Sequence, residues 1–411
     1  MNRRSLVGLL AATATASYLC RVNVAVAGAL MREELSIDPA LLGRVFSAFL
    51  LGYALCQVPA GMLADRFGAR RVLALAALSW VAATALIAVA PAAAAIPVLL
   101  AGRLLLGIGE APTFPAAAQA ISRHVPPSER GRANGIVIAA IGLGSALAPP
   151  LVSSVMLKAG WRAALLVSAF PALAVAVIWL ALKRVPAELT SEAPSTTNKN
   201  TKGRLATRSF ALLTASYTLQ GYVGYIFVFW FYLYLVDVRK FDLLRGAFLS
   251  SLPWLLSIVS IPLGGAVSDL LVRRIGPLWG RRLVPMGGLV GGSLFIAVGA
   301  RTSEPYIAAV CLAFATALVL CVEGPFWATM TGLARGRSGT GGGVMNMGSN
   351  LGGLVSPALT PVLAAAIGWE SALLVAAALS VLGGLLWLGI EPSPPPATAP
   401  HRPNIDPRID N

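Results

Sequence analysis

The chain has 411 residues, of which 57% are hydrophobic and only 12% are charged. Soluble globular proteins carry about 25% charged residues, so this composition excludes a large soluble enzyme. The net charge of +15 could suggest nucleic-acid binding. However, the charges cluster between apolar runs of about 20 residues, the length that crosses the hydrocarbon core of a bilayer. We therefore expect an all-α membrane protein with no nucleic-acid partner.

The apolar runs predict twelve transmembrane helices in two pseudo-symmetric six-helix bundles. If both termini are cytoplasmic, the inner segments hold most of the 32 lysines and arginines, as the positive-inside rule requires. We expect a multi-pass protein of the cell (inner) membrane with both termini in the cytoplasm. The expected helices span 6–30, 44–64, 71–90, 97–122, 132–157, 162–182, 209–235, 246–272, 282–300, 305–333, 340–366 and 370–390.

The segment 183–208 interrupts the hydrophobic pattern with Ser, Thr and Lys, and it predicts a flexible cytoplasmic linker. The linker divides an N-terminal bundle, 1–182, from a C-terminal bundle, 209–390. The proline-rich segment 391–411 predicts a disordered cytoplasmic tail. All four cysteines fall within apolar segments, so we expect free thiols at Cys20, Cys56, Cys311 and Cys321.

The two halves look like copies of one another, because several motifs recur in the same order at similar offsets. A repeat of this size is typical of a duplicated six-helix unit, with a substrate site near the midplane between the halves. The recurring pairs are Gly61 to Asp65 with Gly265 to Asp269, Glu110-Ala-Pro112 with Glu323-Gly-Pro325, Asn134 with Asn346, Pro149 with Pro357, and Gly160-Trp161 with Gly368-Trp369.

Four ionisable residues lie deep in predicted helices: Arg21, Arg103, Glu110 and Glu323. A charge inside a bilayer costs at least roughly 2.5–3.5 kcal/mol, so function is the default explanation for it. The planar guanidinium of Arg21 matches a carboxylate bidentately, and we expect it to hold a substrate anion. The alternative is a structural ion pair between helices.

We expect Glu110 to carry the coupling proton, although a permanent salt bridge with Arg103 or Arg21 is the alternative. Arg103 lies seven residues before Glu110 on the same helix face, and we expect it to support this network rather than to contact substrate. Glu323 mirrors Glu110 in the repeat. It is either a further proton-coupling group that lines the cavity or structural polarity near Pro325.

Two segments resemble signatures of the major facilitator superfamily: GMLADRFGARR at 61–71 and RLLLGIG at 103–109. Within that superfamily the chain is similar to the anion:cation symporter family, which includes aldonate, hexuronate and phthalate permeases, sialin and vesicular glutamate transporters. This similarity spans 15–392. The motifs that carry it are YLCRVN at 18–23, FSAFLLGYALCQVPAG at 46–61, GEAPTFP at 109–115, PPSERG at 126–131, SLP at 251–253, GPFW at 324–327 and Asn346 with the Gly and Pro run beyond it.

The resemblance implies the major facilitator fold and a secondary active transporter. Such a protein would import a small organic anion, a sugar acid or other carboxylate, by proton symport with alternating access. Its partners would be the anion, the coupling ion and the bilayer, and it would be a monomer. The sequence shows no metal-ligand spacing, phosphate loop or catalytic triad, so we expect no cofactor or metal. The coupling ion stays open between proton and sodium.

Two departures from the family pattern matter. Many bacterial sugar-acid transporters of this family have an acidic residue directly before the arginine that corresponds to Arg21, but this chain has Cys20 there. This difference argues against proton coupling by two carboxylates. The fifth expected helix, 132–157, lacks a clear GxxxGPxxGG antiporter signature, which weighs against drug export. The alternatives are a proton-coupled antiporter that exports a drug or metabolite and a membrane enzyme or receptor, although no cluster of catalytic groups supports the last.

The resemblance also implies substrate contacts at Tyr53, Trp327 and Asn346, with ordinary helix packing as the alternative. Tyr18 and Asn23 flank Arg21 and are expected to join the same site. Aromatic faces plus an amide suit a polyhydroxylated or aromatic acid.

A cytoplasmic charge cluster is expected to latch the inner gate, as such clusters do in the superfamily. The alternative is that these charges only set the topology. The cluster comprises Asp65, Arg66, Arg70, Arg71 and Arg130, with Asp269 beside Arg273 and Arg274 as the weaker counterpart in the second half.

Overall fold

The computed structural model describes residues 2–182, 208–334 and 338–392, and the described residues form helices joined by short turns. The first half contains α1 (Arg3–Leu35), α2 (Pro39–Phe67), α3 (Ala69–Ala88), η1 (Ala92–Ala94), α4 (Ala95–Glu110), α5 (Thr113–His124) and α6 (Pro127–Ala181). The second half contains α7 (Arg208–Phe229), α8 (Phe231–Leu233), η2 (Tyr234–Val238), α9 (Leu243–Ile275), α10 (Pro277–Arg301), α11 (Pro305–Cys321), α12 (Glu323–Leu333), α13 (Ser338–Leu386) and η3 (Trp387–Gly389).

Within the described residues, nine helices are long and apolar enough to cross a membrane, or ten if α7 and the bent segment after it form one span. The two longest, α6 and α13, have 55 and 49 residues, well over the roughly 20 residues that one crossing needs. Each bends at a glycine, Gly160 with φ +78° and Gly368 with φ +83°. Side chains disfavour this backbone region, which explains glycine at both repeats of the Gly-Trp motif.

The start and stop signals of α2 recur in α9, and they confirm that the two halves are pseudo-symmetric. Asp38 caps α2 by accepting a hydrogen bond from Leu41 N at 2.8 Å, and Asp242 caps α9 by accepting one from Arg245 N at 2.9 Å. Both helices end at a glycine with positive φ, Gly68 and Gly276.

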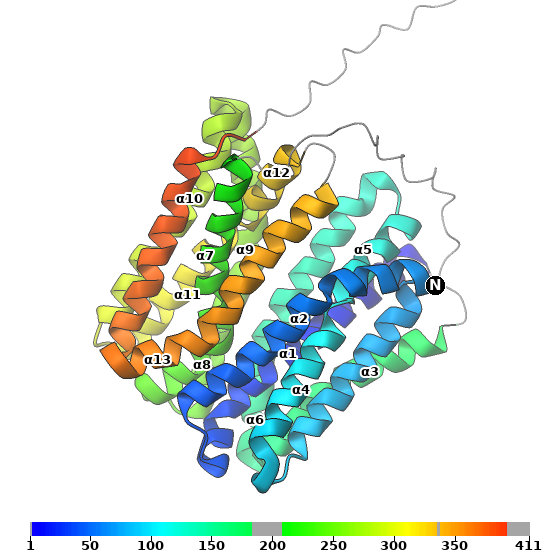
Figure 1. Ribbon diagram of the computed structural model, residues 1–411, viewed down its shortest axis with the longest axis vertical. Coiled ribbons are helices and arrows are strands. Elements are labelled where there is room, and N and C mark those ends of the chain that lie inside the picture. Colours follow the sequence, from blue (N-terminus) through cyan, green and yellow to red (C-terminus); the bar gives the residue numbers. More distant parts are fainter. Residues whose placement is uncertain (1, 183–207, 335–337, 393–411) are drawn as a thin grey trace, which may run out of the picture.

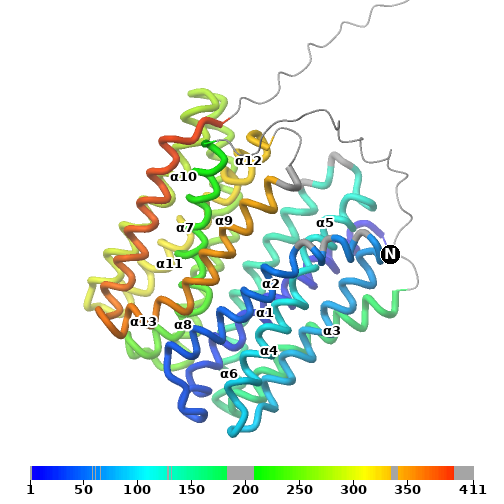
Figure 2. The backbone as a smooth tube through the Cα atoms, viewed as in Figure 1, coloured from blue at the N-terminus to red at the C-terminus, as the bar shows by residue number. Residues whose placement is uncertain are grey.

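The helices form two bundles that lie side by side (Figures 1 and 2). In the first bundle α1 and α3 pack on α6, and α2 packs on α4; in the second bundle α7 packs on α13, and α10 packs on α11 and α13. We call the end of the molecule near Arg3, Arg208 and Ile390 the terminal end. The end near Ser36 and Arg239 is the loop end.

The bundles contact each other toward the loop end, and their ribbons diverge toward the terminal end (Figure 1). Gly43 of α2 lies against α13 so closely that a Cβ atom there would be 2.2 Å from the carbonyl oxygen of Pro357. Nearby, Ser47 Oγ donates a hydrogen bond to Leu354 O at 2.7 Å. These two helices therefore form a seam between the halves.

Three of the expected helices are irregular. The ranges 97–122 and 305–333 each lie in one apolar span long enough to cross a membrane, but the regular helical hydrogen bonding is interrupted between Glu110 and Thr113, at Pro112, and at Val322, just before Glu323. The proline has no backbone N–H to continue the helix ladder, which accounts for the first break. The range 209–235 bends by 53° near Trp230. Both deep acids thus lie at helix breaks.

The predicted free thiols are confirmed at all four cysteines. Arg208 of the predicted linker begins α7, and Glu391 of the predicted tail donates its backbone N–H to Ser209 Oγ at 3.1 Å. The rest of the linker, 183–207, and the segment 393–411 lie outside the described residues.

Candidate functional site

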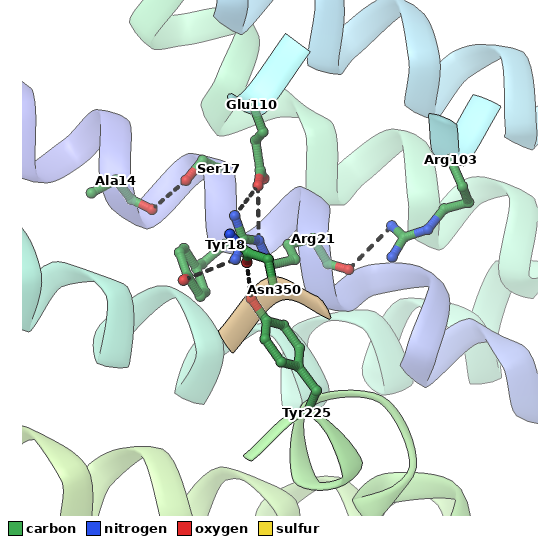
Figure 3. A network of polar contacts seen from close by, with 8 residues as sticks. All are labelled: Ala14, Ser17, Tyr18, Arg21, Arg103, Glu110, Tyr225 and Asn350. Atoms are coloured by element: carbon green, nitrogen blue, oxygen red, sulfur yellow. Dashed lines mark hydrogen bonds and ion pairs between the residues drawn. The ribbon is translucent and has the colours of Figure 1, made fainter. Parts of the chain in front are cut away.

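Arg21 of α1 and Glu110 at the end of α4 form a buried ion pair (Figure 3). Arg21 Nε and Nη2 both donate to Glu110 Oε2, at 2.8 and 2.5 Å, and Nη1 donates to the hydroxyl of Tyr18 at 3.0 Å. The side chains are 3% and 1% exposed. Glu110 Oε1 is buried and has no hydrogen-bond partner among the described residues. One oxygen of Glu110 therefore occupies the donor fork that could recognise a substrate carboxylate.

Three aromatic rings surround the Arg21 guanidinium. Its Cζ atom lies 4.3 Å from the ring centre of Tyr18 and 4.9 Å from those of Phe49 and Tyr53. Phe49 and Tyr53 are one helical turn apart on α2, so they present one face to α1. Cation–π contacts stabilise the charge, and the rings keep water from it. Tyr18 and Tyr53, both predicted site residues, thus lie beside Arg21.

Arg103 is completely buried behind this ion pair. Its Nη1 donates to the main-chain oxygen of Arg21 at 3.2 Å, while Nε and Nη2 have no partner among the described residues. Its Cζ atom lies 4.9 Å from the ring centre of Phe49 and 5.9 Å from that of Phe229, which belongs to the other bundle. Arg103 therefore braces the α1 backbone, and Glu110 hydrogen-bonds to Arg21 rather than to it.

Asn23 lies on a different face of α1 from the one that Arg21 presents. It is fully buried, and its Nδ2 donates to Ser168 Oγ of α6 at 2.9 Å. The side chain thus joins two helices inside the first bundle. The structure does not bring Asn23 into contact with the Arg21 group, although the two residues are two positions apart in the sequence.

Glu323 has its own hydrogen-bond partners in the second bundle. Tyr217 Oη donates to Glu323 Oε2 at 2.8 Å, and Gln220 Nε2 donates to Glu323 Oε1 at 3.0 Å. Both partners lie on α7, three residues apart on one face. Trp327, one turn beyond Glu323 on α12, is 40% exposed. Sequence reasoning missed Tyr217 and Gln220, because uncharged polar residues are common in membrane helices.

Asn346 joins the two bundles. Its Nδ2 donates to Oε1 of Gln57, which lies on α2, at 3.1 Å. This contact belongs to the same α2–α13 seam as Gly43 and Ser47. Gln57 was not among the predicted site residues, although the spacing of four residues between Tyr53 and Gln57 places both on one helix face.

The expected gate arginines bind the ends of neighbouring helices. Arg70 Nε and Nη2 donate to Trp179 O and Leu180 O, at 3.1 and 2.8 Å, where α6 ends. Arg130 donates to main-chain oxygens near the end of α5. A cation at a helix C-terminus stabilises the unpaired carbonyls there. Arg66 lies over the Phe67 ring, Arg71 is exposed, and the side chain of Asp65 is outside the described part of the chain.

Asp269 has a different partner from the one expected. Its Oδ1 accepts a hydrogen bond from Arg281 Nη1 at 2.7 Å, across the turn between α9 and α10. Arg273 and Arg274, the expected partners, are exposed. The chain reverses direction at Gly276, and this reversal brings the start of α10 back beside Asp269.

An ion pair between the two bundles lies at the loop end. Arg32, near the end of α1, donates to Asp237 of the η2 segment, and the two side chains are 19% and 34% exposed. The α7 bend at Trp230 directs this segment toward α1. Together with the α2–α13 seam, the pair fastens the halves at the loop end.

Comparison with known proteins agrees with this architecture. The model of the Major Facilitator Superfamily matches residues 9–357 and 333–409. The probable sulfoacetate transporter SauU of Cupriavidus necator is 32% identical, over 95% of this chain and 94% of that protein. The hexuronate transporter of Bacillus subtilis is 26% identical, over 90% of each chain.

A solved structure shares the fold. A bacterial homolog of the human lysosomal transporter Spinster, in an inward-facing and unoccupied conformation, superposes with a TM-score of 0.80 at 19% identity, over 96% of this chain and 99% of that one. The fold and these relatives define a polytopic membrane transporter rather than an enzyme. The chain belongs to the Major Facilitator Superfamily.

Proposed function

We propose that this protein imports a small organic anion, a sugar acid or another carboxylate, by proton symport. The observation that carries the proposal is the occupation of the Arg21 fork by Glu110 Oε2. A substrate carboxylate can take this fork only after Glu110 releases it, and a proton on Glu110 removes the charge that holds it there. Proton binding then favours anion binding, and the coupling is reciprocal. An antiporter requires the opposite sign.

The charge balance supports an anionic substrate. The buried group contains two guanidiniums, Arg21 and Arg103, and one carboxylate, Glu110. Once Glu110 is protonated, both cations are uncompensated, and an uncompensated buried charge is strongly destabilising. A bound monoanion returns the net charge of the group from +2 to the +1 that it has when Glu110 is ionised. The relatives point to the same class, since one is named for sulfoacetate and another for hexuronate.

The conformation supports alternating access. If the termini are cytoplasmic, the contacts at the loop end close the outer side, and the diverging terminal end faces the cytoplasm. Outward opening then requires the Arg32–Asp237 pair and the α2–α13 seam to separate. In this scheme the helix-end bonds of Arg70 and Arg130 belong to the inward-facing state. When the inner gate closes, Arg70 and Arg130 give up these bonds. The other residues of the expected gate cluster then also change partners: Arg66, Arg71, Asp65 and Asp269.

A ligand screen tests the substrate class. We expect at least one acid among sulfoacetate, hexuronates, aldonates and aldarates to raise the unfolding temperature of the purified protein. A ligand at a hundred times its Kd stabilises the folded state by about 2.7 kcal/mol. Neutral sugars and lipophilic cations are the controls. Stabilisation by the cations alone would replace the proposal with that of a drug exporter.

The proposed topology has twelve crossings, a cytoplasmic linker and cytoplasmic termini in the cell (inner) membrane. We expect an impermeant thiol reagent on intact cells to label Ser303→Cys, in the turn between α10 and α11, but not Asn198→Cys in the linker. The protein without introduced cysteines measures background labelling. Labelling at 198 but not at 303 would invert the topology.

A further inference from the structure

Four uncharged polar side chains form a hydrogen-bonded group between the bundles, which we call the amide bridge. Gln57 Oε1 accepts from Asn346 Nδ2 at 3.1 Å and from Asn350 Nδ2 at 3.4 Å. Tyr225 Oη donates to Asn350 Oδ1 at 3.4 Å. Gln57 comes from the first bundle, on α2, whereas the two asparagines lie one turn apart on α13 and Tyr225 lies on α7. The bridge therefore contains groups from both halves.

The bridge lies farther along the α2–α13 seam than the contacts at the loop end. Gln57 is ten residues beyond Ser47 on α2, a rise of about 15 Å toward the terminal end. The Ser47 hydroxyl donates a hydrogen bond to a main-chain oxygen, so this contact holds the two helices together without involving a side chain of α13. Gln57 instead meets side-chain amides. The seam is thus closed by backbone contacts near the loop end and by exchangeable side-chain hydrogen bonds at Gln57.

Tyr225 connects the amide bridge to the charged groups. It is close enough to Arg21, Glu110 and Glu323 to interact electrostatically with all three. Figure 3 shows its hydroxyl directed at Asn350 beside the Arg21 group. A substrate whose acid group takes the Arg21 fork would therefore extend its remaining atoms toward Tyr225, the asparagines and Gln57.

The hydrogen-bonding capacity of the bridge is only partly used. Gln57 and Asn346 are half-buried, and within the described residues neither Gln57 Nε2 nor Asn346 Oδ1 makes a hydrogen bond. The first is a donor and the second is an acceptor. A hydroxyl group can accept from one and donate to the other, whereas an alkyl chain satisfies neither. A site that can hydrogen-bond a substrate hydroxyl discriminates against analogues that lack it.

We infer that Gln57 is a specificity-determining residue and that the amide bridge binds hydroxyl groups on the uncharged part of the substrate. This inference rests on the proposed function, because it assumes that an acid group binds at Arg21. On binding, the substrate hydroxyls replace the contacts of Gln57 with Asn346 and Asn350, so the substrate touches both bundles. The preferred substrates are then hydroxylated acids rather than alkyl acids of the same charge.

A matched pair of acids tests the inference. D-gluconate and hexanoate have the same carbon chain and charge, and differ in their hydroxyl groups. We expect the full-length protein to bind D-gluconate more tightly in calorimetric titrations. The Gln57→Leu variant should lose about tenfold in D-gluconate affinity, as expected for one or two hydrogen bonds, and stay within about twofold for hexanoate.

Ser47→Ala is the control, because it removes a seam hydrogen bond without altering the amides. We expect it to change the affinities for both acids by the same small factor. If Gln57→Leu does not fold, Asn346→Ala removes the shorter of the two amide contacts of Gln57 from the other half and should give the same selective loss.

The outcomes separate the inference from the proposed function. Equal loss for both acids in Gln57→Leu, or no preference for D-gluconate in the unaltered protein, overturns the role of Gln57. In that case Arg21-dependent binding of other acids in the ligand screen still upholds the anion transporter. If no acid binds in an Arg21-dependent way, both the proposed function and the inference are wrong.

Discussion

Replacing Arg21 by lysine should weaken anion binding about a hundredfold, although the positive charge stays. Lysine offers a single ammonium group and cannot reproduce the two parallel donors, Nε and Nη2, that now hold Glu110 Oε2. Each hydrogen bond to a charged group contributes about 1.5–3 kcal/mol, so the loss of the bidentate arrangement costs roughly 3 kcal/mol. Titration of the purified variant with the best acid from the ligand screen measures the loss.

A matched arginine controls for general damage to the fold. Arg239 is also rich in hydrogen bonds, since it donates to the Tyr234 hydroxyl and to main-chain oxygens at the C-terminal end of α10, those of Gly299 and Thr302. It lies at the loop end, away from the Arg21 group. We expect Arg239→Lys to lower the unfolding temperature while leaving anion affinity unchanged. Normal affinity in Arg21→Lys would show that Arg21 is not the anion clamp.

Much of the fold could be predicted from the sequence because the bilayer imposes simple constraints. Backbone groups in hydrocarbon must be paired internally, so long apolar runs are helices. The expected helix boundaries at 157–162 and 366–370 coincide with the bends of α6 and α13, where Gly160 and Gly368 adopt positive φ without strain. The helix breaks beside Glu110 and Glu323 were missed. Pro112 was visible in the sequence, but prolines also occur within continuous membrane helices such as α2, which contains Pro59.

The candidate site was only partly predictable. Charges stand out in membrane helices because they are costly, and this singled out Arg21, Arg103 and Glu110. Their pairing did not follow from spacing, since Arg21 and Glu110 are 89 positions apart and Glu110 shares a helix with Arg103. Uncharged partners such as Gln57 and Tyr217 carry no comparable signal. Only the packing of α2 on α13 and of α7 near α12 brings them to the site.

Glu110→Gln should separate exchange from accumulation. Glutamine keeps the size and hydrogen-bonding capacity of the protonated acid, but it stays neutral at every pH. The variant resembles the protonated carrier, in which Glu110 has released Arg21 and the substrate can bind there. Counterflow exchange of labelled substrate should therefore survive, because both half-reactions use the loaded carrier. Uphill uptake driven by a pH gradient should disappear, because the return of the empty carrier no longer requires the release of a proton.

The other deep acid supplies the matched comparison. Glu323 accepts hydrogen bonds from Tyr217 and Gln220 and has no arginine partner among the described residues, so we expect that a proton there does not release a substrate-binding cation. We expect Glu323→Gln to retain accumulation driven by the pH gradient. Paired counterflow and pH-driven uptake, measured on both variants in proteoliposomes, decide between the acids. Accumulation that persists in Glu110→Gln and is lost in Glu323→Gln would move the proton to the second bundle. Accumulation that persists in both variants but requires sodium would replace proton coupling with sodium coupling, while the anion site at Arg21 would stand.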